Sequence, residues 1–302
     1  MDAWIPVTLA AASAQTVRFM LQKHLKSTRL STMGATFSRF IYSAPLVAFI
    51  LVGYLWSTGQ AWPATSARFW GFALAGGLAQ ILATLCVVAL FAERNFAVGI
   101  TLKKTEVLQA AILGFLVLGE AVTLPAAGAI LLGFVAVLFL SEGAAETGQV
   151  TRGHGFFNRA IGLGLLSGVL FAFSGIGYRG ATLAIESNSA VLRAGVTLAL
   201  VTASQSLAMG TWLLWRDRAQ LAAVLRAWRV AGLVGVASMI GSFCWFLAFT
   251  LQTVAYVKAL GQVELVLSVL ASVLFFRERV TVRELGGIAL LLVSILVLVL
   301  VT

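Results

Sequence analysis

The run Ala97–Leu118 reads AVGITLKKTEVLQAAILGFLVL and is apolar except for three charged residues, Lys103, Lys104 and Glu106. As a helix, with a rise of 1.5 Å per residue, it would be about 33 Å long, close to the thickness of the hydrocarbon core of a bilayer. A charge at that depth costs several kcal/mol, so charged residues inside membrane segments usually serve a function.

A second run of the same kind lies near the C-terminus. Ala255–Phe276 contains Lys258 and Glu264, and Glu264 follows Glu106 at a separation of 158 residues. Further identical pairs share this separation: Gly77/Gly235, Cys86/Cys244, Glu120/Glu278, Thr123/Thr281 and Gly128/Gly286. Matches of Glu, Gly and Thr at one spacing are harder to obtain by chance than matches of Leu or Val. They predict an internal repeat, with halves 1–141 and 160–302 joined by a polar connection at 142–159.

The composition identifies the broad class of protein. Of the 302 residues, 60% are hydrophobic and 11% are charged, and the mean hydropathy is +0.99. A soluble domain has about 25% charged residues, so we expect an all-α integral membrane protein. The net charge of +10 fits cytoplasmic loops that face anionic lipid, and it does not indicate nucleic-acid binding.

Ten apolar segments are expected to cross the membrane as helices. They lie near residues 4–22, 33–56, 69–91, 97–118, 122–141, 160–178, 190–214, 230–250, 255–276 and 284–301. Because five helices per half is an odd number, the second half must enter the membrane in the opposite sense. This predicts ten transmembrane helices in two inverted-topology five-helix repeats, an arrangement typical of secondary transporters. The basic segment 216–229 is expected to be a short amphipathic helix at the interface.

The loop charges predict the orientation. Thirteen Lys and Arg residues fall in the loops on one side of the ten segments, whereas Arg68 and Arg179 fall on the other. By the positive-inside rule the first side is cytoplasmic. Both chain termini are therefore expected outside the cytoplasm.

The sequence contains none of the enzyme motifs for which we searched. It has no Walker A motif and no nucleophile elbow, and neither His24 nor His154 belongs to a Cys/His cluster with metal-ligand spacing. We therefore expect a protein that is not an enzyme and that needs no metal or cofactor.

The membrane carboxylates need partners. Lys103 and Glu106 are three residues apart and share a helix face, so they can form a structural pair. Lys258 lies six residues from Glu264 and about 120° around the same helix. Glu264 therefore needs a partner on another helix, a proton or a water-filled cavity.

Other polar positions have structural interpretations. Arg39 and Arg193 lie at similar places in the two halves, and we interpret them as structural residues, with binding of a substrate carboxylate as the alternative. Arg18 lies one turn from the end of its helix and is interpreted as snorkelling to the interface. Gly261, mid-way along segment 255–276, permits a bend there.

Two short motifs resemble the drug/metabolite transporter superfamily in its ten-helix EamA-type form. Ser38-Arg39-Phe40 is similar to the Arg-Phe motif of the family, and Leu118-Gly119-Glu120-Ala121-Val122-Thr123 is similar to its Leu-Gly-Glu…Thr signature. The second half repeats the signature as Phe276-Arg277-Glu278-Arg279-Val280-Thr281. Glu120 and Glu278 are expected to have structural or gating roles. Within the superfamily the chain is most similar to the YddG-type aromatic amino acid exporters, although the proline common in the fourth and ninth helices is absent.

The resemblance implies an exporter in the bacterial inner membrane that carries amino acids, aromatic and other small neutral ones, and related metabolites by alternating access. Its central cavity would be lined by segments 4–22, 69–91, 97–118, 160–178, 230–250 and 255–276. A zwitterion needs a cation for its carboxylate, an acceptor for its ammonium group and an apolar wall. The candidates are Lys103, Lys104 and Lys258 for the first, Glu106 and Glu264 for the second, and Tyr256, Trp245 and Tyr178 for the third.

Two alternatives stay open. One is a drug or nucleotide-sugar transporter of the same superfamily, and the other is a non-transporting membrane interaction or receptor-like subunit. The expected partners are a small-molecule substrate and membrane lipid, with no nucleic acid. The sequence leaves open whether transport is proton-coupled or uniport. It also leaves the oligomeric state open, with a monomer as one option.

The predicted orientation is testable with a reporter fused after Thr302. Because the positive loops place both termini outside the cytoplasm, the fusion should give an extracytoplasmic signal. A cytoplasmic signal from the C-terminal fusion would overturn the predicted orientation.

Overall fold

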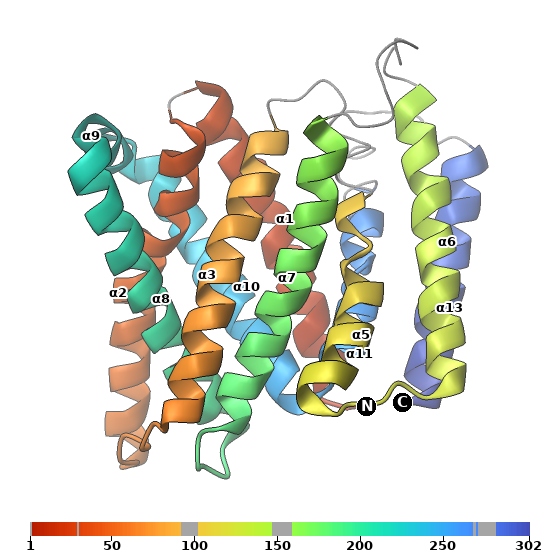
Figure 1. Cartoon of the computed structure of the whole chain (residues 1–302), viewed down its shortest axis with the longest axis horizontal. Helices are drawn as coiled ribbons and strands as arrows, with labels where there is room; N and C mark the ends of the chain where they lie inside the picture. Colours follow the sequence, from red (N-terminus) through yellow and green to blue (C-terminus); the bar gives the residue numbers. More distant parts are fainter. Residues whose placement is uncertain (1, 29, 92–101, 147–158, 268–269, 271–281) are drawn as a thin grey trace.

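The computed structural model describes residues 2–28, 30–91, 102–146, 159–267, 270 and 282–302, and every regular element in these ranges is a helix. Most of the helices stand side by side in an upright bundle (Figure 1). They are α1 (Trp4–Thr28), α2 (Thr32–Thr58), α3 (Ala67–Leu90), α5 (Glu106–Leu118), α6 (Leu124–Glu146), α7 (Arg159–Leu183), α8 (Ala190–Arg216), α9 (Arg218–Arg226), α10 (Trp228–Leu251), α11 (Val254–Leu260) and α13 (Val282–Val301).

The outside of the bundle suits a lipid environment. Large apolar side chains such as Phe49 and Leu124 are exposed by 81% and 87%, which water would disfavour. Within the described ranges, five helices are long and apolar enough to cross a membrane: α2, α3, α7, α8 and α10. Three further apolar helices are shorter, over Glu106–Leu118, Leu124–Phe139 and Leu285–Val301. The chain is thus an all-helical, multi-pass membrane protein.

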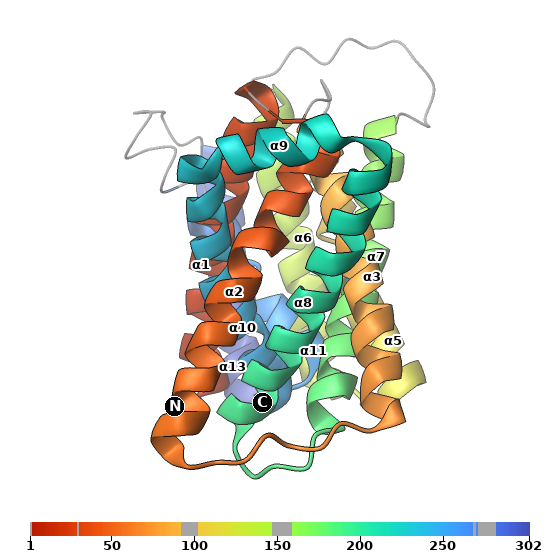
Figure 2. The same cartoon turned by 90° about the vertical axis from the view of Figure 1, so that its left-hand side faces the viewer.

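The basic segment after α8 forms the predicted short helix. Asp217 caps α9 by accepting a hydrogen bond from the backbone N–H of Gln220 (3.1 Å), as is usual at a helix N-terminus. Figure 2 shows α9 lying across one end of the bundle, roughly at right angles to the upright helices. Helix α1 begins and α13 ends at the opposite end (Figure 1).

Helices that are distant in the chain pack against each other. The main pairs are α3 with α7, α1 with α10, α6 with α13, and α2 with both α8 and α10. Small residues permit the closest of these approaches. Gly177 of α7 faces Gly76 of α3 so tightly that a methyl group on Gly177 would lie 2.8 Å from the Gly76 Cα. Such small-residue contacts are the common way for membrane helices to pack closely.

Two segments expected to cross the membrane as helices, 97–118 and 255–276, are interrupted. The break at Gly261 falls where the sequence permits a bend, whereas the break at Lys104 and Thr105 was not predicted. Helix α5 begins only at Glu106, after a turn at Lys104 and Thr105, and α11 ends at Leu260 before a turn at Gly261 and Gln262. A turn frees backbone polar groups, which the membrane interior tolerates only where protein or water satisfies them.

Some predicted features lie outside the described residues. Among them are Glu278 and most of the connection 142–159. The described part of that connection begins as helix, because α6 continues to Glu146, and α7 starts at Arg159.

The contact between α3 and α7 predicts a stability effect. Gly177→Ala should lower the free energy of unfolding by about 1–3 kcal/mol, because the added methyl group overpacks a backbone contact. The matched control is Gly162→Ala on the same helix, where an added methyl group meets nothing within 4 Å. The measurement is the thermal unfolding temperature of the purified protein in detergent, and equal temperatures for the two variants would refute the prediction.

Candidate functional site

The two helix breaks meet inside the bundle. The side-chain amide of Gln262, in the turn after α11, donates a hydrogen bond to the backbone carbonyl of Lys104, in the turn before α5 (3.4 Å). These two positions are separated by 158 residues, the spacing of the sequence repeat. The side chain of Gln262 therefore satisfies one backbone carbonyl freed by the turn before α5, and the two turns bring their charged neighbours together.

Ion pairs cross between the two breaks. Glu106 accepts a hydrogen bond from the Lys258 ammonium at 3.5 Å and pairs with Lys103 at 3.7 Å. Glu264 pairs with Lys104 and, at 3.8 Å, with Lys103. All five side chains are buried. Glu264 thus has a partner on another segment, which is one of the three alternatives that its sequence position left open.

A small cavity lies beside this ion-pair cluster. Six helices, α1, α2, α3, α7, α10 and α11, contribute to its polar lining, with Gln15, Arg39, Gln80, Ser174, Ser242 and Lys258. Its free volume is about 20 Å³, close to what one ordered water molecule needs and far too little for an amino acid. The structure therefore shows the cavity in a closed state.

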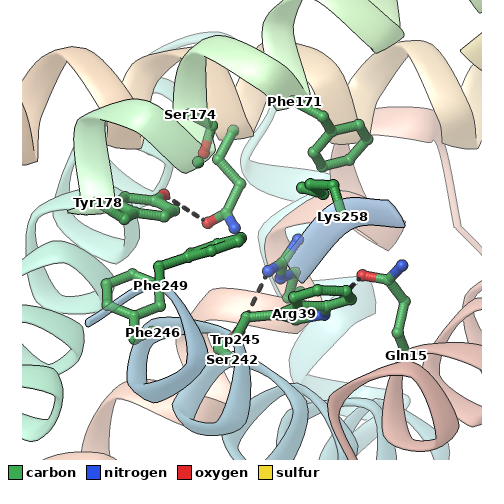
Figure 3. Close-up of a pocket in the computed structure, with 12 residues that line it drawn as sticks. Gln15, Arg39, Phe171, Ser174, Tyr178, Ser242, Trp245, Phe246, Phe249 and Lys258 are labelled. Atoms are coloured by element: carbon green, nitrogen blue, oxygen red, sulfur yellow. Dashed lines mark hydrogen bonds between the residues drawn. The ribbon is translucent and has the colours of Figure 1, made fainter. Parts of the chain in front are cut away.

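Aromatic side chains form the rest of the cavity wall (Figure 3). Tyr178 of α7 stacks on Phe246 of α10, with ring centroids 4.1 Å apart, and Trp245 stacks on Phe249 at 5.6 Å. Phe171 of α7 completes this wall. The wall offers flat apolar surfaces suited to an aromatic or aliphatic group.

Two cations face the cavity, Arg39 from α2 and Lys258 from α11 (Figure 3). The Arg39 guanidinium donates hydrogen bonds to the hydroxyl groups of Thr84 (3.1 Å) and Ser242 (3.2 Å). It is only 4% exposed. A buried guanidinium held by neutral hydroxyls retains donors for an anionic ligand, because it carries five N–H groups.

Gln15 links the cavity to the ion-pair cluster. Its amide nitrogen donates to Glu264 (2.7 Å), and its amide oxygen accepts from the Trp245 indole (3.1 Å) and from Arg18 (3.3 Å). Arg18 is 3% exposed and also donates to Gln22. The interpretation of Arg18 as a snorkelling residue was therefore wrong: the glutamines of its own helix solvate it inside the protein.

The predicted site residues do not all lie in one site. Tyr178, Trp245 and Lys258 line the cavity, whereas Lys103, Lys104, Glu106 and Glu264 make up the adjacent ion-pair cluster. Of the other described residues with predicted roles, Arg39 lines the cavity and Gly261 lies in the turn after α11, whereas Tyr256, Arg193 and Glu120 lie elsewhere. Five of the six segments expected around a cavity contribute to its lining, and α2 takes the place of segment 97–118.

Tyr256 and Arg193 lie outside the cavity lining. The Tyr256 hydroxyl accepts a hydrogen bond from the backbone N–H of Thr123 (3.2 Å), which ties α11 to the start of α6. Arg193 is half-buried on α8, and its Nε atom has no hydrogen-bond partner among the described residues.

Glu120 has a structural partner. It pairs with Arg179 of α7, which also donates to the backbone carbonyls of Phe249 (2.6 Å) and Gln252 (2.7 Å) at the end of α10. A cation at a helix C-terminus satisfies carbonyls that lack intrahelical partners. The Glu120–Arg179 pair therefore joins the end of α5 to α7 and α10.

Sequence reasoning missed several lining residues. Gln15 and Gln80 are polar groups within apolar helices, and that was a usable signal for a buried site. Ser174, Ser242 and Phe171 carried no such signal, because serine and phenylalanine are ordinary residues of membrane helices.

The ion-pair cluster predicts a large stability effect. Glu106→Gln should lower the free energy of unfolding by about 3–5 kcal/mol, because Lys103 and Lys258 lose the carboxylate that both contact. Glu186→Gln is the control, since it removes the same charge from an exposed position. Thermal unfolding in detergent, followed by tryptophan fluorescence, measures both variants. A Glu106→Gln protein as stable as the control would contradict this role of the cluster.

Comparisons with known proteins agree with this architecture. A crystal structure of a protein matches with a TM-score of 0.67 over 98% of this chain and 99% of that chain, at 14% sequence identity. At that identity the likeness shows the fold alone. Among curated proteins the chain has no match. Residues 158–300 match the model of the EamA-like transporter family. The second half of the chain is therefore similar to the EamA-like transporter family.

Proposed function

We propose that the chain exports amino acids and related small metabolites across a bacterial inner membrane by alternating access. The observation that carries this proposal is the buried cavity beside the meeting point of the two helix breaks, with Arg39 and Lys258 next to an aromatic wall. Discontinuous helices that meet at a buried site are typical of secondary transporters.

The helix contacts support two inverted five-helix repeats in a ten-helix chain. The repeat relates α1 to α7, α3 to α10 and α2 to α8. It therefore relates the contact of α1 with α10 to that of α7 with α3, and both are among the main contacts of the bundle. The contacts of α2 with α8 and of α6 with α13 each join a helix to its own equivalent, as expected near a two-fold axis.

The cavity chemistry supports a small organic solute with a carboxylate. Arg39 and Lys258 supply cations for the carboxylate, and a charge-assisted hydrogen bond of this kind contributes about 1.5–3 kcal/mol. The stacked pairs Tyr178/Phe246 and Trp245/Phe249 supply the surface for a side chain. Because the closed cavity is too small for an amino acid, loading requires the halves to move apart, first on one side of the membrane and then on the other.

Counterflow in proteoliposomes tests the proposal. Vesicles are loaded with unlabelled phenylalanine, tryptophan or alanine and placed in labelled amino acid, with and without a pH gradient. We expect uptake of label only in vesicles that contain the protein. Acceleration by the gradient would point to proton coupling, with Glu264 as the first candidate, and an unchanged rate would indicate a uniporter.

Arg39→Gln should raise the half-saturating amino-acid concentration about tenfold or more, because 1.4 kcal/mol corresponds to a factor of ten. The exposed arginine Arg216, changed to Gln, is the control and should behave like the unaltered protein. Exchange of drugs or nucleotide sugars but of no amino acid would favour the other branch of the superfamily. No exchange of any solute would favour a non-transporting subunit.

A further inference from the structure

The described residues of the cavity wall present cations and no carboxylate. Among the described lining residues, Arg39 and Lys258 are the charged ones. Two of the five N–H donors of Arg39 bond to hydroxyl groups, and its side chain has no carboxylate partner in the described part of the chain. An anion entering the cavity therefore meets charge complementarity, whereas a cation does not.

The carboxylates nearest the cavity are already engaged. Glu106 contacts two ammonium groups, those of Lys103 and Lys258, and Glu264 contacts Lys104, Lys103 and the Gln15 amide. To bind a substrate ammonium, either carboxylate would have to release a buried lysine. Breaking a buried pair leaves an uncompensated charge and is strongly unfavourable.

The two side-chain amide oxygens of the cavity lining are engaged as well. The Gln15 amide oxygen accepts from Trp245 and Arg18. The Gln80 amide oxygen accepts from the Tyr178 hydroxyl (2.8 Å) and from the Gln205 amide (3.0 Å). The lining therefore offers few vacant oxygens to the three donors of an ammonium group.

Lys258 also occupies the aromatic faces. Its ammonium nitrogen lies 5.0 Å from the ring centroid of Trp245, 5.5 Å from that of Phe171 and 5.8 Å from that of Phe249. These are cation–π distances. A substrate ammonium seeking the same rings would compete with Lys258 and be repelled by its charge.

From these contacts we propose that the cavity selects aromatic carboxylates that lack an ammonium group, the deaminated counterparts of aromatic amino acids, over the amino acids themselves. Arg39 binds the carboxylate, and the stacked aromatic pairs hold the ring. The inference rests on the proposed function, since it takes this cavity to be the solute site, and it narrows the class of solute.

The balance of charges around the cavity also favours an anionic solute over a zwitterion. In the described part of the chain, the cluster and the cavity wall together hold four buried basic side chains, Arg39, Lys103, Lys104 and Lys258, against the two carboxylates of Glu106 and Glu264. An excess of charge of one sign is costly in a membrane interior. A bound anion reduces the excess, whereas a zwitterion leaves the net charge unchanged.

Calorimetric titration of the purified protein in detergent at neutral pH tests the proposal. The three probes share one ring: 3-phenylpropionate has only the carboxylate, L-phenylalanine has both charged groups, and phenethylamine has only the ammonium. We expect 3-phenylpropionate to bind at least tenfold more tightly than phenylalanine, and phenethylamine to give no measurable binding.

Variants assign the effect to the cavity. Arg39→Gln should weaken 3-phenylpropionate at least tenfold and reduce its advantage over phenylalanine, and Arg216→Gln should leave both unchanged. Lys258→Met should improve phenethylamine binding, because it frees the aromatic faces and removes the repelling charge. The series of three probes on the unaltered protein decides the question even where a variant does not fold.

The outcomes separate this inference from the proposed function. Phenylalanine binding as tightly as 3-phenylpropionate, or phenethylamine binding most tightly, would overturn the inference, and so would the absence of binding by all three probes. Amino-acid counterflow that persists in any of those cases would leave the proposed function standing. Absence of counterflow with every solute would remove the proposed function itself.

Discussion

This structure depends on one physical constraint: every buried charge in a membrane interior needs a partner. Glu106 and Glu264 meet it through lysines from the other half of the chain, Lys258 and Lys104. The breaks at the start of α5 and the end of α11 bring them together, and the hydrogen bond from Gln262 to the carbonyl of Lys104 satisfies part of the backbone that the breaks free.

The same constraint fixes where a cavity can lie. Gln15 joins Glu264 to the Trp245 indole, so the ion-pair cluster and the aromatic wall share one hydrogen-bonded residue. At another part of the cavity wall, the Tyr178 hydroxyl donates a hydrogen bond to Gln80 and accepts one from Gln205. Gln205 also donates to the carbonyl of Gly77 (2.9 Å). The cavity is thus a polar region enclosed by helices whose outer faces are apolar. Its position follows from the charges in the sequence and not from a gap in packing.

The sequence predicted the membrane class, the short helix α9 and the positions of the buried charges, because apolar length and charge spacing are local properties. It assigned Arg39 and Arg193 one structural role, and their environments differ: Arg39 lies at the cavity between Thr84 and Ser242, and Arg193 is half-buried on α8. It placed Tyr256 in the apolar wall, yet Tyr256 lies outside the cavity lining while Lys258 belongs to it, because residues two apart on a helix point in different directions. In both cases the packing of helices from distant parts of the chain decides where the side chain lies, and that packing cannot be read from the pattern of a single sequence.

The helix break and the cavity wall are in direct contact. At Gly261 a methyl group would lie 2.6 Å from Cη2 of Trp245, so the indole rests against the turn that ends α11. Lys258, one turn earlier, faces the cavity and pairs with Glu106 across the halves. A solute that displaces Trp245 acts on the turn that ends α11, and one that displaces Lys258 acts on its ion pair with Glu106. Through these two residues, filling the cavity would be coupled to the contact between α11 and α5.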